Sequence, residues 1–136
     1  MSLLINNRLI VFRGYGAGVW RYGQYLHLDI APKCDFLNKN YRDFIFNQST
    51  HGEHFFPVDK ATVGQFTGYF DTQEKPIYEG DLVIVSHPWD DVYEIKYTDR
   101  INSFILQKQG QEHLFLELRD LSSWDMEIIG NIHNLK

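Results

Sequence analysis

The sequence predicts an all-β fold, an antiparallel barrel with at most short helices, and two observations lead to that prediction. Short runs of alternating apolar and polar residues are separated by turn-forming residues, which is the pattern of strands with one buried face. Aromatic residues make up 15% of the chain, and their side chains favour the pleated surface of a sheet. Helix signals are weak, because the best of them, Glu117 to Trp124, is too short to persist without packing.

The first half of the chain contains short predicted strands interrupted by glycine. Residues 8–13 alternate between two faces, and residues 19–29 resemble the two strands of a hairpin around Gly23. Residues 43–46 form a short apolar run, and residues 47–52 should form a polar loop. The break after the first strand is expected at three glycines, Gly14, Gly16 and Gly18.

The second half shows the strand pattern more clearly. Residues 62–69 predict a strand, followed by a turn over residues 71–76. Residues 82–85 are continuously apolar, as expected of a strand that is covered on both faces. The pattern predicts a hairpin around Gly110. The later strand candidates are residues 92–97, 103–108, 113–116 and 126–132.

Size, charge and cysteine content exclude several classes of protein. A chain of 136 residues is long enough for one domain with one core, and we expect residues 1–136 to form it. The single cysteine, Cys34, excludes an intrachain disulfide and a cysteine-based zinc site. The net charge of −5, with scattered Lys and Arg, argues against general nucleic-acid or anionic-membrane binding. With no signal-peptide pattern and no apolar stretch of membrane-spanning length, we expect a cytoplasmic protein.

Turn chemistry accounts for the residues that would otherwise be candidates for a site. Glycine permits positive φ, and a turn aspartate can accept hydrogen bonds from backbone N–H groups. Asparagine tolerates the left-handed region, and a glycine within an apolar strand suggests a bulge. We therefore interpret six positions as structural: Gly68, Asp71, Gly80, Asp81, Gly130 and Asn131.

No catalytic, metal-binding or cofactor-binding residue is predicted. His51 and His54 are the one metal-like pair, but we expect an exposed loop there, and a zinc site needs three or four convergent ligands. The Asp90-Asp91 pair has no nucleophile beside it, and Ser86-His87 lacks the context of a hydrolase nucleophile. We therefore expect neither an enzyme nor a cofactor.

Three segments carry a resemblance to a known family. They are Gly64-Gln65-Phe66-Thr67-Gly68-Tyr69-Phe70-Asp71, Ile77-Tyr78-Glu79-Gly80-Asp81-Leu82-Val83 and Glu127-Ile128-Ile129-Gly130-Asn131-Ile132. Together they resemble the YopX family of small proteins, encoded mostly by bacteriophages and prophages, whose pattern is Q-[FY]-T-G-x-x-D, I-Y-E-G-D-[IL]-V and E-V-I-G-N-I. Residues 62–134 hold the recognisable motifs. Where the family usually has an Asn-Gly-like pair, this chain has Gln73-Glu74, which tolerate positive φ poorly.

The resemblance implies a mainly β fold with an SH3-like barrel element, an unassigned molecular function, and no catalytic residues to transfer. We expect a non-catalytic phage- or prophage-derived accessory protein in the cytoplasm of a bacterial host. It would act by binding another macromolecule, a protein rather than a nucleic acid or a membrane, or by forming a homo-oligomer. The alternative is a nucleic-acid-binding β-barrel, because single-strand binders stack bases on aromatic clusters. The aromatic residues in question are Tyr15, Trp20, Tyr22 and Tyr25.

Overall fold

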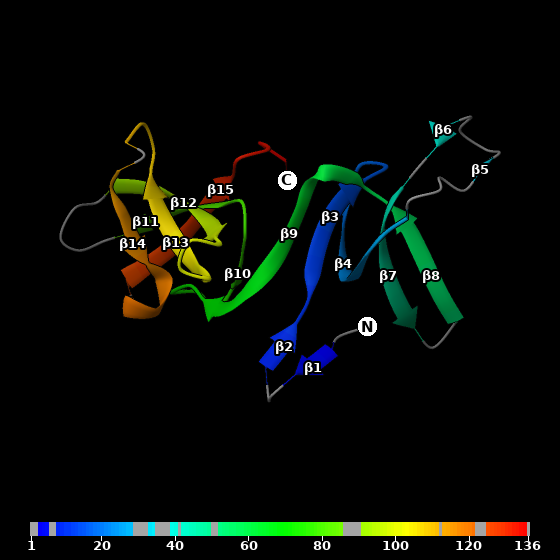
Figure 1. Ribbon diagram of the computed structural model, residues 1–136, viewed down its shortest axis with the longest axis horizontal. Helices are drawn as coiled ribbons and strands as arrows, with labels where there is room; N and C mark the ends of the chain where they lie inside the picture. The colour runs from blue at the N-terminus through cyan, green and yellow to red at the C-terminus, as the bar shows by residue number, and fades with distance from the viewer. Residues whose placement is uncertain are drawn as a thin grey trace. The chain divides into compact units, whose positions relative to one another are not determined.

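The computed structural model describes residues 3–5, 8–28, 33–34, 39–40, 42–49, 52–85, 91–111, 113–121 and 125–135. In these residues the chain consists of antiparallel strands joined by turns, with only short stretches of 3-10 helix, so the all-β prediction is confirmed (Figure 1). The chain divides into two compact units, residues 1–65 and 66–136. None of the described helical residues forms a helix long and apolar enough to cross a membrane.

The first unit is built on one antiparallel sheet with the strand order β9-β3-β4-β7-β8. Strand β9 begins in this unit and ends in the second. Two further strand pairs, β1-β2 and β5-β6, accompany the sheet. The bounds are β1 Leu3–Ile5, β2 Arg8–Ile10, β3 Phe12–Gly16, β4 Val19–His27, β5 Lys33–Cys34, β6 Lys39–Asn40, β7 Asp43–Ser49, β8 Gly52–Pro57 and β9 Asp59–Phe70.

Strand β4 corrects the predicted hairpin around Gly23. Residues 19–27 form one continuous strand, and Gly23 lies in its middle. A Cβ atom at Gly23 would collide with the carbonyl oxygen of Phe46 on β7. The glycine therefore permits close approach of two strands and does not form the predicted turn. Likewise, Gly14 and Gly16 lie inside β3, and the chain turns only at Ala17 and Gly18.

The predicted loop over residues 47–52 is shorter than expected. Strand β7 continues to Ser49, and β8 begins at Gly52. His54 lies within β8, so the predicted loop is wrong at this residue, although its side chain is exposed as predicted. Its ring stacks on Phe56 with the centroids 5.8 Å apart. His51 lies outside the described residues.

The second unit contains a four-stranded meander, β11 to β14, followed by a 3-10 helix and a strand that returns beside β11 (Figure 1). Strand β10 pairs separately with the end of β9. The hairpin around Gly110 is formed, but the predicted helix over residues 117–124 is reduced in the described residues to 118–120. The bounds are β10 Pro76–Tyr78, β11 Asp81–Val85, β12 Asp91–Thr98, β13 Ser103–Lys108, β14 Phe115–Glu117, η1 Leu118–Asp120 and β15 Met126–Asn131.

The core of the second unit lies against one face of this meander. Val83 and Val85 of β11 are fully buried, whereas Leu82 and Ile84 are only partly covered. The prediction that residues 82–85 are covered on both faces is therefore met completely on one face and only in part on the other. Strands β14 and β15 each pair on one side among the described residues, so these pairings do not close a barrel. The buried cluster consists of Ile77, Val83, Val85, Tyr93, Ile95, Leu106, Leu118 and Met126.

Candidate binding site

The face of the meander opposite the core carries a concave site. Ile95 and Leu106 pair across β12 and β13 and are both fully buried. Because successive side chains alternate between the two faces of a strand, the next pair, Lys96 and Ile105, points to the outer face. Phe115 of β14 pairs with Gln107 and lies on the same outer face.

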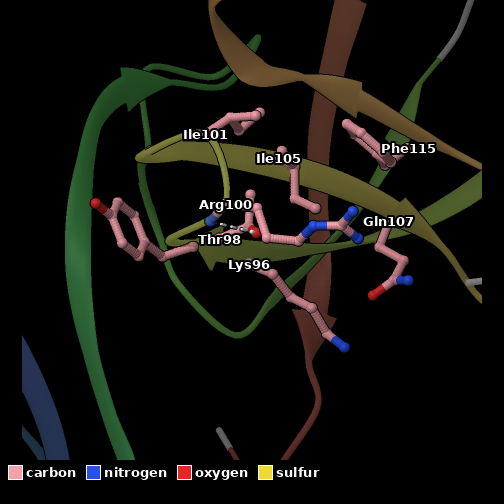
Figure 2. A pocket seen from close by; sticks show the side chains of 8 residues that line it. Lys96, Thr98, Arg100, Ile101, Ile105, Gln107 and Phe115 are labelled. Carbon is pink, nitrogen blue, oxygen red and sulfur yellow. Dashed lines mark hydrogen bonds between the residues drawn. The ribbon is translucent and has the colours of Figure 1, made fainter.

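A cavity of about 390 Å³ lies on this outer face (Figure 2). Ile105 forms part of its apolar lining and is 7% exposed, whereas Ile101 and Phe115 are 45% and 49% exposed. The volume is near the lower end for small-molecule sites and suits one bulky side chain or a small ligand. The eight lining residues are Lys96, Tyr97, Thr98, Arg100, Ile101, Ile105, Gln107 and Phe115.

The turn between β12 and β13 places Arg100 and Ile101 beside the cavity. The Thr98 hydroxyl accepts a hydrogen bond from the Arg100 backbone N–H over 3.4 Å. Asn102 has a φ of 50°, in the left-handed region that asparagine tolerates. The Arg100 side chain extends over the sheet between Ile105 and Lys96 (Figure 2). The turn thus brings a cation and an apolar side chain to the same site.

The electrostatics of the cavity differ from those of the whole chain. Lys96 and Arg100 contribute two positive charges, and no carboxylate lines the cavity, although the protein carries a net charge of −5. In the part of the chain that the structure describes, neither cation forms an ion pair. The nearby Glu117 binds Arg119 over 3.2 Å. The site can therefore bind an apolar group and an anion together, and its lining contains no histidine, cysteine or carboxylate for acid–base chemistry.

Asp71, a predicted structural residue, organises the turn between β9 and β10. Its Oδ1 accepts hydrogen bonds from the backbone N–H groups of Gln73 and Lys75, both 2.9 Å away, and its Oδ2 accepts one from Ile128 over 3.1 Å. Burial alone would raise the pKa of Asp71, but these donors outweigh it and hold the pKa below its ordinary value. Glu74 in this turn has a φ of 62° despite its poor tolerance of positive φ.

Gly80 and Asp81 form the corner that precedes β11. Gly80 has a φ of 92°, its N–H donates to the Ile95 carbonyl over 2.8 Å, and its carbonyl accepts from Ile132 over 2.9 Å. The Oδ2 atom of Asp81 accepts a hydrogen bond from the Tyr78 N–H over 2.8 Å. These contacts are with backbone groups of the second unit.

The other predicted structural positions also lie outside the cavity lining. Gly68, in β9, has a φ of 88°. The β11–β15 register shifts between Leu82, which pairs with Gly130, and Val83, so an irregularity lies beside Gly130. The Asn131 side chain donates to the Leu135 carbonyl over 2.6 Å and accepts from the His133 N–H over 3.0 Å.

The aromatic cluster of the first unit is largely engaged in internal contacts. Tyr15 and Trp20 meet edge to face with centroids 5.3 Å apart, and Arg13 lies over the Trp20 ring at 4.5 Å. Tyr25 donates its hydroxyl hydrogen to Asp43. Tyr22 is the exposed member of the four, at 46%.

Sequence reasoning missed the residues of the cavity and the contacts of Asp43. The residues that line the cavity have no recognisable spacing in the sequence. They include a lysine, an arginine and three apolar residues spread over β12 to β14, and only strand pairing brings them together. Asp43, at the start of an apolar run, gave no indication that Tyr25 and His27 would both bind it. Within the described residues no group of three or more His, Cys, Asp or Glu side chains could hold a metal ion.

Comparison with known proteins identifies one family. The family model described as YopX protein matches residues 19–135, which is nearly the whole chain. No curated protein is a significant match to the sequence.

Proposed function

The chain belongs to the YopX family, and from that premise we propose that it is a non-catalytic accessory protein, encoded by a phage or prophage. It acts in the cytoplasm of a bacterial host by binding another macromolecule, and we favour a protein partner. The observation that carries this proposal is the cavity on the outer face of β12 to β14. Its exposed apolar side chains, and two cations that form no ion pair with any residue the structure describes, are features of a binding surface.

The strand order of the second unit supports an SH3-like assignment within this proposal. A four-stranded meander, a 3-10 turn and a last strand returning to the first make a small β scaffold with exposed side chains on its outer face. Such scaffolds carry many functions, so the assignment of a binding role rests on the site and not on the fold. A second copy of this chain is the other occupant that the proposal allows.

Nucleic-acid binding through the aromatic cluster is the alternative function. Base stacking needs exposed rings with cations beside them. Arg13 is 7% exposed beneath its contact with Trp20, and the net charge of the chain is −5. We therefore expect random-sequence DNA to bind more weakly than about micromolar at physiological salt, as fluorescence anisotropy would measure.

Site-specific photo-crosslinking in phage-infected or prophage-induced cells tests the proposal. A benzoylphenylalanine replaces Ile101 at the cavity or, as a matched control, Ile129 of β15, which is similarly exposed at 49%. We expect a protein adduct from position 101 and not from position 129. An adduct with a second copy of the chain would identify self-association. Adducts that are absent or equal at the two positions would refute binding through this face.

A further inference from the structure

Resting on the proposed function, we infer that the element bound in the cavity is an acidic peptide segment of a protein partner, anchored by one bulky apolar side chain. Three features of the second unit lead to this chemistry: the depth of the apolar lining, the charge around it, and the apolar surface that continues beyond it.

The apolar lining supplies the anchor pocket. Ile105 is 7% exposed although it lies on the outer face of the sheet, whereas Ile101 and Phe115 are about half exposed. Figure 2 shows Ile101 and Phe115 on either side of Ile105. An inserted apolar side chain would contact all three and remove them from water, which is the main source of affinity in a hot-spot pocket.

The charge of the lining selects an acidic ligand. Lys96 pairs with Ile105 across β12 and β13, the Arg100 side chain lies between them, and neither cation forms an ion pair with a described residue. Two other cations of this unit already have carboxylate partners: Lys108 binds Asp91 over 3.1 Å, and Arg119 binds Glu117 over 3.2 Å. Glu94, two residues before Lys96, lies on the same face but does not line the cavity. An incoming carboxylate would therefore meet two cations without displacing an existing partner.

The extent of the apolar surface favours a chain segment over a small molecule. Ile101 and Phe115 are each about half exposed and lie on either side of Ile105 (Figure 2), so an occupant that covers all three must spread across the face. A peptide can insert one side chain and cover the rest with its neighbours. Acidic residues of the peptide, next to its apolar anchor side chain, would then reach the ammonium group of Lys96 and the guanidinium group of Arg100.

Selection from a random-sequence peptide library against the full chain tests this inference. We expect enriched peptides to combine Asp or Glu with a Trp, Phe or Leu. The best labelled peptide is then measured by fluorescence anisotropy against Lys96→Glu, Arg100→Glu and Phe115→Ala. Each change should weaken binding about tenfold or more, and added salt should weaken binding to the parent chain. Arg42→Glu, an exposed charge reversal in the first unit, is the matched control and should leave binding unchanged.

The outcomes separate this inference from the function on which it rests. Enriched peptides that are neutral or basic, but lose binding in Phe115→Ala, would overturn the acidic-ligand inference and leave the proposed function standing. The inference would also be overturned if none of the cavity substitutions altered peptide binding, or if the selection enriched no peptide. In those two cases the crosslinks from position 101 decide the proposed function independently. Thermal unfolding of each variant verifies that it remains folded.

Discussion

The Tyr25 hydroxyl donates a hydrogen bond to Oδ1 of Asp43 over 2.6 Å, joining strand β4 to the first residue of β7. The same oxygen lies 2.8 Å from Nδ1 of His27, which pairs directly with Asp43 in the register of the two strands. Burial alone would raise the pKa of Asp43, but the hydrogen bonds from Tyr25 and His27 outweigh it and lower that pKa. The carboxylate therefore stabilises the first unit in its charged form.

Acid should weaken the first unit through Asp43. Its folded-state pKa lies below the unfolded value, so its contribution to stability is present above the unfolded pKa and is lost as pH falls through the folded one. Asp43→Asn should reduce stability at neutral pH and flatten the acid limb of a plot of melting temperature against pH. Asp99→Asn, an exposed turn residue, is the control and should retain the parent acid limb. An unchanged acid limb in Asp43→Asn would show that the carboxylate is not coupled to folding.

Alkali should act on the same contact through Tyr25. Burial, together with the hydrogen bond and the charge of Asp43, raises the pKa of Tyr25 from 10.0 to about 12. Because the folded-state pKa is raised, this stabilisation is complete below pH 10 and is lost as pH rises toward 12. Ultraviolet titration of tyrosinate should show a late-titrating phenol that Tyr25→Phe removes, whereas Tyr22→Phe, at a residue 46% exposed, should leave that late component in place. Loss of the late component in Tyr22→Phe instead would contradict the assignment.

Removing Asp71 should destabilise the second unit. Asp71→Ala leaves three backbone N–H groups without their acceptor, which costs about 1–3 kcal/mol for each such group that stays buried. Chemical denaturation should show the loss, and Asp99→Ala, in an exposed turn, should lie close to the parent. Equal stability of the two variants would mean that water replaces the carboxylate without cost.

The corner at Gly80 should be structural and not a binding site. With a φ of 92°, Gly80→Ala should cost about 1 kcal/mol and Gly80→Val considerably more, through backbone strain. Asp81→Ala should cost about 1 kcal/mol, because it leaves the Tyr78 N–H without its acceptor. Gly130→Ala is the control, since its φ is not in the left-handed region and a Cβ there meets no other atom. If the Gly80→Val and Asp81→Ala variants melt at the parent temperature but no longer bind a partner protein, the structural interpretation is wrong.

The close approach of β4 and β7 should depend on Gly23. Gly23→Ala places a Cβ against the Phe46 carbonyl oxygen, so the strands must separate, and we expect a loss of about 2 kcal/mol or more in thermal unfolding. Gly18→Ala has a positive φ but open space around it, so it should cost about 1 kcal/mol from backbone strain alone. A Gly23→Ala variant no weaker than Gly18→Ala would show that the strands separate at little cost.

The strand pattern was predictable, but the role of each glycine was not. Alternation of apolar and polar residues comes from the period of a strand and is local, so β9, β11 and the Gly110 hairpin follow from sequence. A glycine in a strand is compatible with a turn, a bulge or close backbone contact. Only the neighbouring strand decides among these three roles. The local pattern therefore predicted a turn at Gly23, whereas this glycine lies within β4.

The all-β class, the family and the turn at Asp71 follow from the sequence alone, because they depend on local periodicity and on motifs contiguous in the chain. Which residues share the outer face of the meander depends on the fold of the whole unit. Lys96, Ile105 and Phe115 lie on three different strands, and their meeting depends on register, since a slip of one residue would move each side chain to the opposite face. The contact of Tyr25 with Asp43 depends on strand pairing in the same way. Long-range pairing, which no local pattern encodes, therefore created both the candidate site and the buried carboxylate.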